Sequence, residues 1–170
     1  MTIRVVLADD HEMLREEIMA LLAGQDGMEV VGEAVDGESA LDQARLLQPD
    51  VVVMDISMPR GGGVTATRQI RAELPEVRVV ALSLYSESVY VQAMLDAGAS
   101  GYVVKTSAAR DLVPAIESIA AGKRYLSPEI DGQDGIEETR TARRAATGSP
   151  PRIAASCVAP CTAGRRQGMV

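Results

Sequence analysis

Short runs of apolar residues alternate along the chain with longer stretches in which apolar residues recur every three or four positions. Five short runs are rich in β-branched residues and predict strands; they occupy residues 3–8, 28–34, 51–54, 77–82 and 101–104. The stretch after each run predicts a helix, the first with Leu14, Ile18 and Leu22 on one face. Pro49 and Pro75 mark the ends of the second and third helices.

The last predicted helix contains a proline. Ser107 is expected as its N-cap and Gly122 as its stop, which places Pro114 near the middle of the helix. Proline there removes a backbone donor and clashes with the preceding turn. We therefore expect the helix either to begin later, near Asp111, or to be kinked.

Strict alternation of strand and helix predicts an α/β fold, with a five-stranded parallel sheet covered by helices on both faces. The run 51–54 is continuously apolar, which is typical of a central strand buried on both sides. Five such units favour a small open, doubly wound sheet over an eight-fold barrel. Ligands of open parallel sheets bind outside the carboxyl ends of the strands, so the site is expected there.

The composition narrows the class of protein. Of 170 residues 46% are hydrophobic, yet there is no Phe, no Trp and only four Tyr. The core is therefore aliphatic, and binding sites that stack flavins or single-stranded nucleic acid on aromatic planes are disfavoured. No uncharged apolar run approaches the ~18 residues of a membrane span. The first apolar run leads straight into Asp9 and Asp10, unlike a signal peptide, so a cytoplasmic protein without membrane contact is expected.

Charge divides the chain into a body and a tail. The net charge is −7, but residues 1–130 carry −9 and residues 131–170 carry +2. These last 40 residues hold only five large aliphatic side chains, and no helical stripe passes through them. Such a composition cannot offset the entropy cost of ordering. We predict one domain over residues 1–128 and a disordered tail over 129–170.

Polar residues gather where the predicted strands end. Asp9 and Asp10 follow the first strand, Asp55 the third, Ser83 the fourth and Lys105 the fifth. Three converging carboxylates repel one another unless a cation lies among them, and hard oxygen ligands suit Mg²⁺. Mg²⁺ with a lysine and a hydroxyl nearby is a recurrent arrangement for holding a phosphoryl group, with one carboxylate as a candidate nucleophile.

Four segments carry a family resemblance. They read VVLADDH over 5–11, MDISMP over 54–59 with Gly63 behind it, ALS over 81–83 and GASGYVVK over 98–105. Together they resemble the receiver domain of two-component response regulators of the NarL/FixJ type, over residues 3 to 128. The resemblance implies a flavodoxin-like sheet of strand order 2-1-3-4-5. It also implies a phosphorelay protein that takes a phosphoryl group from a sensor histidine kinase and switches conformation.

The same resemblance assigns the metal and phosphoryl residues. Asp55 is similar to the phosphoacceptor of the family. Asp10, Asp55 and the backbone carbonyl of Ser57 resemble the direct Mg²⁺ ligands, and Asp9 resembles the acid that holds the metal through water. His11, which follows the acidic pair, is interpreted as a solvated loop residue.

Three further residues resemble the switch of the family. Lys105 is expected to pair with the phosphoryl oxygens, Ser83 to hydrogen-bond the phosphoryl group and Tyr102 to turn inward behind it. The chain has only one other lysine, Lys123, so a lysine at this position is not background composition. A compact ammonium fits a crowded site better than the planar fork of arginine.

The output half of such regulators is not recognisable. Family members regulate transcription through a helix-turn-helix domain, and residues 131–170 show no such pattern, as if truncated or read out of frame. DNA binding by this chain is therefore not expected, whereas a phosphorylation-dependent homodimer is compatible with the family. Two alternatives stay open: an intact DNA-binding regulator with an unrecognised output segment, and a metal-dependent phosphate-ester hydrolase. Against the hydrolase, Ser57 stands where such an enzyme needs a second acid, so the only catalysis expected is self-phosphorylation and dephosphorylation.

Overall fold

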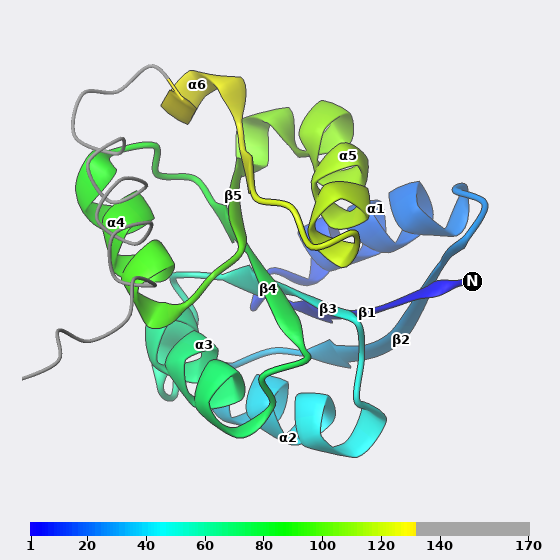
Figure 1. The fold of residues 1–170 in the computed structure, drawn as a ribbon, viewed down its shortest axis with the longest axis horizontal. Coiled ribbons are helices and arrows are strands. Elements are labelled where there is room, and N and C mark those ends of the chain that lie inside the picture. The colour runs from blue at the N-terminus through cyan, green and yellow to red at the C-terminus, as the bar shows by residue number, and fades with distance from the viewer. Residues whose placement is uncertain (132–170) are drawn as a thin grey trace, which may run out of the picture. The chain divides into compact units, whose positions relative to one another are not determined.

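The computed structural model describes residues 1–131, and the rest of the tail predicted over 129–170 lies outside them (Figure 1). The strands are β1 (Ile3–Ala8), β2 (Met28–Ala34), β3 (Val51–Asp55), β4 (Arg78–Ser83), β5 (Gly101–Val104) and β6 (Tyr125–Leu126). The helices are α1 (Glu12–Ala23), α2 (Gly37–Leu47), α3 (Gly62–Glu73), α4 (Ser88–Ala97), α5 (Ala108–Ala120) and α6 (Pro128–Asp131), with a 3₁₀ turn, η1 (Lys105–Ser107), before α5. The predicted α/β alternation is confirmed.

The strands form one parallel sheet in the order β2-β1-β3-β4-β5-β6. The predicted order of the first five is therefore correct, and a sixth strand extends the sheet. Residues of β6 pair with β5 in the register Gly101↔Tyr125 and Tyr102↔Leu126. Two residues are too short a run to show any periodicity, which is why the sequence did not predict this strand.

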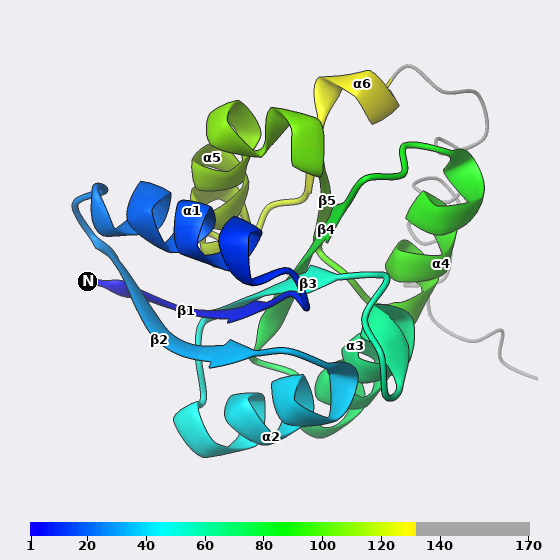
Figure 2. The ribbon, with the colours of Figure 1, turned by 180° about the vertical axis from the view of Figure 1, so that it is seen from behind.

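Helices cover both faces of the sheet. Figures 1 and 2 show α1 and α5 on one face and α2, α3 and α4 on the other. Successive strand residues point to opposite faces, so β3 sends Val51 and Val53 into the core beneath α1 and α5, and Val52 and Met54 into the other core. All five residues of β3 are buried, as its continuous apolar sequence predicts.

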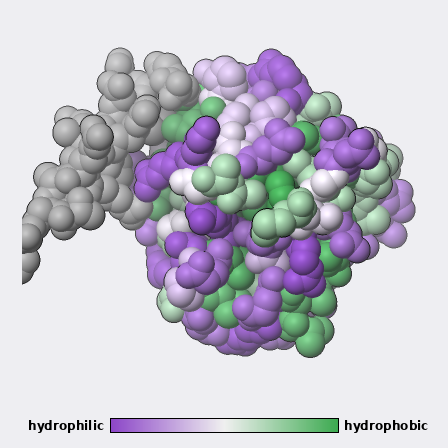
Figure 3. Space-filling model, turned by 45° about the vertical axis from the view of Figure 1, so that its right-hand side comes forward, coloured by the Kyte–Doolittle hydropathy of each residue, from purple (hydrophilic) through white to green (hydrophobic). Residues whose placement is uncertain are grey.

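In Figure 3 hydrophobic residues lie in small patches separated by hydrophilic ones on the face shown. Among residues 1–131, no helix is both long enough and apolar enough to cross a membrane.

Helix α5 begins at Ala108 and continues through Pro114, so the later start near Asp111 is wrong. Ser107 occupies the N-cap position, but its side chain makes no capping hydrogen bond. Its hydroxyl instead donates to the carbonyl of Val104, 3.1 Å away. The start of α5 is therefore fixed by η1 and by the segment that docks beside it.

That segment comprises residues 125–131. Its Ile130 side chain is fully buried, two residues beyond the predicted domain boundary at 128. The Ser127 amide donates to the carbonyl of Tyr102 at 2.9 Å, and the Ser127 hydroxyl donates to Asp111 Oδ2 at 2.9 Å. The chain leaving α5 is thus attached both to the edge of the sheet and to the first turn of the helix.

Asp111 is the electrostatic centre of this attachment. The Arg110 guanidinium donates to its two carboxylate oxygens at 2.7 and 3.0 Å. The hydrogen bonds from Arg110, and to a smaller extent the one from the Ser127 hydroxyl, lower the pKa of Asp111 to about 2 from its ordinary value of 3.8. A carboxylate with a lowered folded-state pKa stabilises the fold above its unfolded pKa and loses that contribution as the pH falls through the folded pKa.

We therefore expect Asp111→Asn to lower the free energy of unfolding by about 2 kcal/mol at neutral pH. The difference from wild type should shrink as the pH falls from about 4 towards 2, because the wild-type carboxylate is then protonated as well. Urea unfolding followed by circular dichroism at several pH values measures this. Glu129→Gln, at an exposed partner of Arg110, is the control and should change the free energy of unfolding less. A difference between Asp111→Asn and wild type that does not depend on pH contradicts the assignment.

Candidate functional site

The predicted site residues lie at the carboxyl ends of neighbouring strands. Asp9 directly follows β1, Asp55 is the last residue of β3, Ser83 is the last residue of β4 and Lys105 directly follows β5. Because β1, β3, β4 and β5 are parallel and adjacent, these ends meet at one edge of the sheet.

Lys105 joins the first and third strand ends. Its Nζ lies 2.6 Å from Asp9 Oδ2 and 3.0 Å from Asp55 Oδ2. The side chains are 6%, 0% and 2% exposed, respectively, so all three charges are held away from water. One ammonium thus holds two buried carboxylates close together, and neither of the two oxygens has a further hydrogen-bond partner among the described residues.

The other carboxylate oxygens face backbone donors. The amide of His11 donates to Asp9 Oδ1 at 2.8 Å, and the amide of Ser57 donates to Asp55 Oδ1 at 3.2 Å. Each carboxylate is therefore oriented by one backbone N–H and one ammonium. The second bond also places Ser57, whose carbonyl the family resemblance assigns as a ligand, directly beside Asp55.

A candidate metal centre is formed by Asp9, Asp10, His11 and Asp55, whose ligand atoms all lie within 4.8 Å of one another. Three carboxylates and one ammonium leave this cluster with excess negative charge, which a divalent cation balances. The oxygen donors fit a hard cation. The sequence predicts His11 as a solvated loop residue, and its side chain is indeed 64% exposed. Its Nδ1 nevertheless lies 2.9 Å from Asp10 Oδ1 and 3.2 Å from Asp9 Oδ1.

Ser83 and Tyr102 form a second group, joined through the backbone of Tyr85. The Tyr85 amide donates to Ser83 Oγ at 3.1 Å, and the Tyr102 hydroxyl donates to the Tyr85 carbonyl at 2.6 Å. Tyr102 is fully buried, and burial raises its pKa to about 12. Sequence reasoning missed Tyr85, because it acts through backbone groups that any residue supplies.

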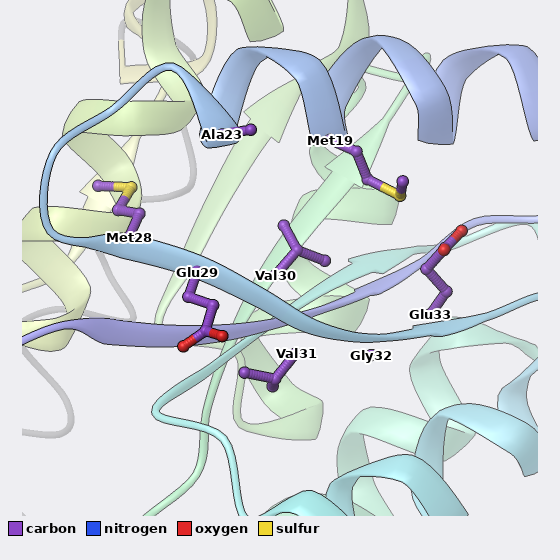
Figure 4. A pocket seen from close by; sticks show the side chains of 8 residues that line it. All are labelled: Met19, Ala23, Met28, Glu29, Val30, Val31, Gly32 and Glu33. Carbon is purple, nitrogen blue, oxygen red and sulfur yellow. The ribbon is translucent and has the colours of Figure 1, made fainter.

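Two surface pockets differ in their relation to this site. A pocket of about 350 Å³ is lined by His11 and Lys105 and by the exposed apolar side chains of Met13 and Leu84, so it opens beside the acidic cluster. A pocket of about 480 Å³ runs along β2 (Figure 4). Its lining residues are Met19, Ala23 and the strand residues 28–33, and they include no member of the acidic cluster.

Residues 5–117 match the family model described as the response regulator receiver domain. The response regulator GacA of Pseudomonas viridiflava is 44% identical over 131 residues, which are 77% of this chain and 61% of GacA. The response regulator protein VraR of Staphylococcus aureus (strain NCTC 8325 / PS 47) is 40% identical over 130 residues, 76% of this chain and 62% of VraR. This chain thus spans less than two thirds of these relatives.

Solved structures show the same fold. A LuxR-family two-component response regulator from Aurantimonas sp. SI85-9A1 has a TM-score of 0.76 and 40% identity, covering 83% of this chain and 99% of that one. The isolated REC domain of RcsB from Salmonella enterica serovar Typhimurium, solved with the phosphomimetic BeF₃⁻, has a TM-score of 0.72 and 27% identity, covering 77% and 97%.

We expect Lys105→Met to lower the free energy of unfolding by about 3 kcal/mol, because it leaves two buried carboxylates without their cation. Saturating MgCl₂ should then stabilise the variant more than it stabilises wild type. Thermal and urea unfolding with and without the salt measure both effects. Lys123→Met, at the exposed second lysine, should behave as wild type; equal effects of the two substitutions contradict the pairing.

Proposed function

This chain belongs to the response regulator receiver family, and we propose that Asp55 is its phosphoacceptor in phosphorylation-dependent two-component signalling. The observation that carries the proposal is the contact of the Lys105 ammonium with Asp55 Oδ2 at the carboxyl end of β3. An ammonium at this distance from the attacking carboxylate also reaches the oxygens of a phosphoryl group bonded to it. In the transfer, a phosphohistidine P–N bond breaks and a P–O bond to Asp55 forms.

We further propose Mg²⁺ as the cation of the acidic cluster. Asp10, Asp55 and the Ser57 carbonyl would hold it directly, and Asp9 would hold it through water. When bound, it supplies neutralisation of the charge on the phosphoryl oxygens. Lys105 and one backbone amide contact the oxygens of Asp9 and of Asp55 alike, so the outer role of Asp9 rests on the family resemblance. The carboxylate of Asp10, by contrast, is partly exposed and contacts the His11 ring alone among the described ion pairs.

The proposed response uses the second group of residues. Once Asp55 carries the phosphoryl group, Ser83 would hydrogen-bond it. Tyr102, whose side chain is already buried, would turn further inward behind Ser83 and hold the new position of the loop after β4. The existing bonds of Ser83 and Tyr102 to Tyr85 support this, because a shift of Ser83 Oγ pulls on the same backbone residue that Tyr102 holds. The phosphoryl group would thereby bias a two-state element.

The partners follow from the family. We propose a sensor histidine kinase as phosphoryl donor and a homodimer of the phosphorylated chain. A solved structure of two RcsB dimers bound to two parallel DNAs supports dimer formation by a relative with 25% identity. We do not propose that this chain binds DNA, since its segment after residue 131 lies outside the described structure. The domain boundary and the cytoplasmic location stay predictions. Turnover of a separate phosphate ester is not proposed either, because Ser57 offers no acid beside Asp55.

Incubation with acetyl phosphate and MgCl₂ should add one phosphoryl group to the wild-type chain. Asp55→Asn should abolish the addition, since an amide oxygen is not the nucleophile that the transfer needs. Mass spectrometry of the intact chain and of its peptides measures the addition and its position. Asp26→Asn, at an exposed acid outside the cluster, is the matched control, and an undiminished signal in Asp55→Asn contradicts the assignment.

Mg²⁺ affinity should depend more on Asp10 than on Asp9. We expect Asp10→Asn to raise the dissociation constant by about tenfold or more, because it removes a direct charged ligand. Asp9→Asn should cost less, because Asp9 holds the ion through water. An NMR titration of amide shifts with MgCl₂, without a phosphoryl donor, gives both constants. Equal losses in the two variants are incompatible with the outer position of Asp9.

A further inference from the structure

The loop between β3 and α3 carries Ser57 and ends in a backbone that needs support. Three consecutive residues, Arg60, Gly61 and Gly62, have φ angles of 46°, 94° and 60°. Glycine adopts this left-handed region freely but loses more entropy than other residues when it is fixed there. Arginine pays a steric cost in the same region, so contacts from elsewhere must hold it.

The turn between β2 and α2 supplies these contacts. The Gly37 amide donates to the Pro59 carbonyl at 3.3 Å, and the Arg60 guanidinium pairs with Asp36 Oδ2. Asp36 is also the N-cap of α2, where its Oδ1 accepts from the Ser39 amide at 2.7 Å. The bonds from Ser39, together with Arg60, keep the pKa of Asp36 below its ordinary value, so the carboxylate is charged at neutral pH.

Gly37 touches the loop backbone to backbone. A Cβ at this position would lie 2.9 Å from the Arg60 carbonyl oxygen, and 3.0 and 3.2 Å from the carbonyl oxygen and amide nitrogen of Gly62. Real Cβ atoms are rarely this close to backbone atoms, so any larger side chain pushes the loop away from α2. We call the contacts of Asp36 and Gly37 with residues 59–62 the α2 clasp.

The beginning of the same loop is attached to the metal centre. The Ser57 amide donates to Asp55 Oδ1 at 3.2 Å, and the Gly63 amide closes the loop on the Ile56 carbonyl at 3.0 Å. The Met58 side chain is buried in the core and anchors the middle of the loop there. The Ser57 carbonyl therefore lies in a short closed loop whose tip is fixed by the α2 clasp, and a displaced tip moves it.

We infer that Asp36, Gly37 and Arg60 are positioning residues for the metal centre, and that the α2 clasp sets the Mg²⁺ affinity by holding the Ser57 carbonyl in place. This inference rests on the proposed function, in which that carbonyl is a ligand. It adds that the affinity is controlled from the N-terminus of α2, an element that contributes no ligand itself. Partners that orient the ligands of a metal commonly change its affinity by 10–100-fold, and the α2 clasp orients the loop that carries one such ligand.

The test compares Gly37→Ala and Arg60→Ala with Ser39→Ala in the full chain. Ser39→Ala weakens the N-terminus of α2, because Ser39 Oγ accepts from the Asp36 amide, but no described hydrogen bond joins Ser39 to residues 59–62. Each variant is titrated with MgCl₂ alone, by NMR amide shifts, and its thermal unfolding is measured without metal. We expect Gly37→Ala to raise the dissociation constant about tenfold and Arg60→Ala to raise it by a smaller factor. Ser39→Ala should lower the unfolding temperature but leave the dissociation constant within about twofold of wild type.

The outcomes separate the two proposals. Wild-type protein that does not bind Mg²⁺ contradicts the proposed metal centre itself. Wild-type binding with unchanged affinity in both Gly37→Ala and Arg60→Ala contradicts only the α2 clasp. If Gly37→Ala does not fold, Arg60→Ala decides, because it removes the ion pair without placing an atom against the loop. An affinity loss in Ser39→Ala equal to that in Arg60→Ala also overturns the inference, since general loosening of α2 then explains both.

Discussion

A single buried ammonium, that of Lys105, lies between the carboxylates of Asp9 and Asp55, and the rest of the site depends on this contact. Two carboxylates buried side by side are unfavourable without a cation, and the cation is itself unfavourable without them. The three residues come from the ends of β1, β3 and β5, so the contact forms only when these strands are parallel and correctly ordered. Folding of the sheet and assembly of the site are therefore the same event.

The hydrophobic core, which is aliphatic apart from Tyr102, gives this contact its rigid frame. Strand β5 connects the core to the site, because Tyr102 belongs to the core and Lys105 directly follows the last residue of the strand. The same strand pairs with β6, and Ser127 donates to the Tyr102 carbonyl. A change at Lys105 or Tyr102 is thus adjacent to the segment through which the chain leaves the domain.

The sequence predicted most of the fold because its strands are continuous apolar runs and its strand ends are polar. The polar strand ends also indicated Asp55 and Lys105 as site residues, since ligands of open parallel sheets bind at the carboxyl ends of the strands. The sequence missed β6, whose two residues have no period, and it missed Tyr85, which acts through its backbone. The sequence also does not predict the pairing of Asp36 with Arg60, because the two residues lie in loops 24 positions apart that share no local pattern.

The most direct measurement of the central claim is a crystal structure of the chain grown with MgCl₂ and beryllium fluoride. We expect a BeF₃⁻ group on a carboxylate oxygen of Asp55, with Lys105 Nζ in contact with a fluorine. We also expect one Mg²⁺ ion bound by Asp10, Asp55 and the Ser57 carbonyl. An adduct on another carboxylate, a metal ion bound through His11 in place of Asp10, or Lys105 turned away from the adduct would contradict the account.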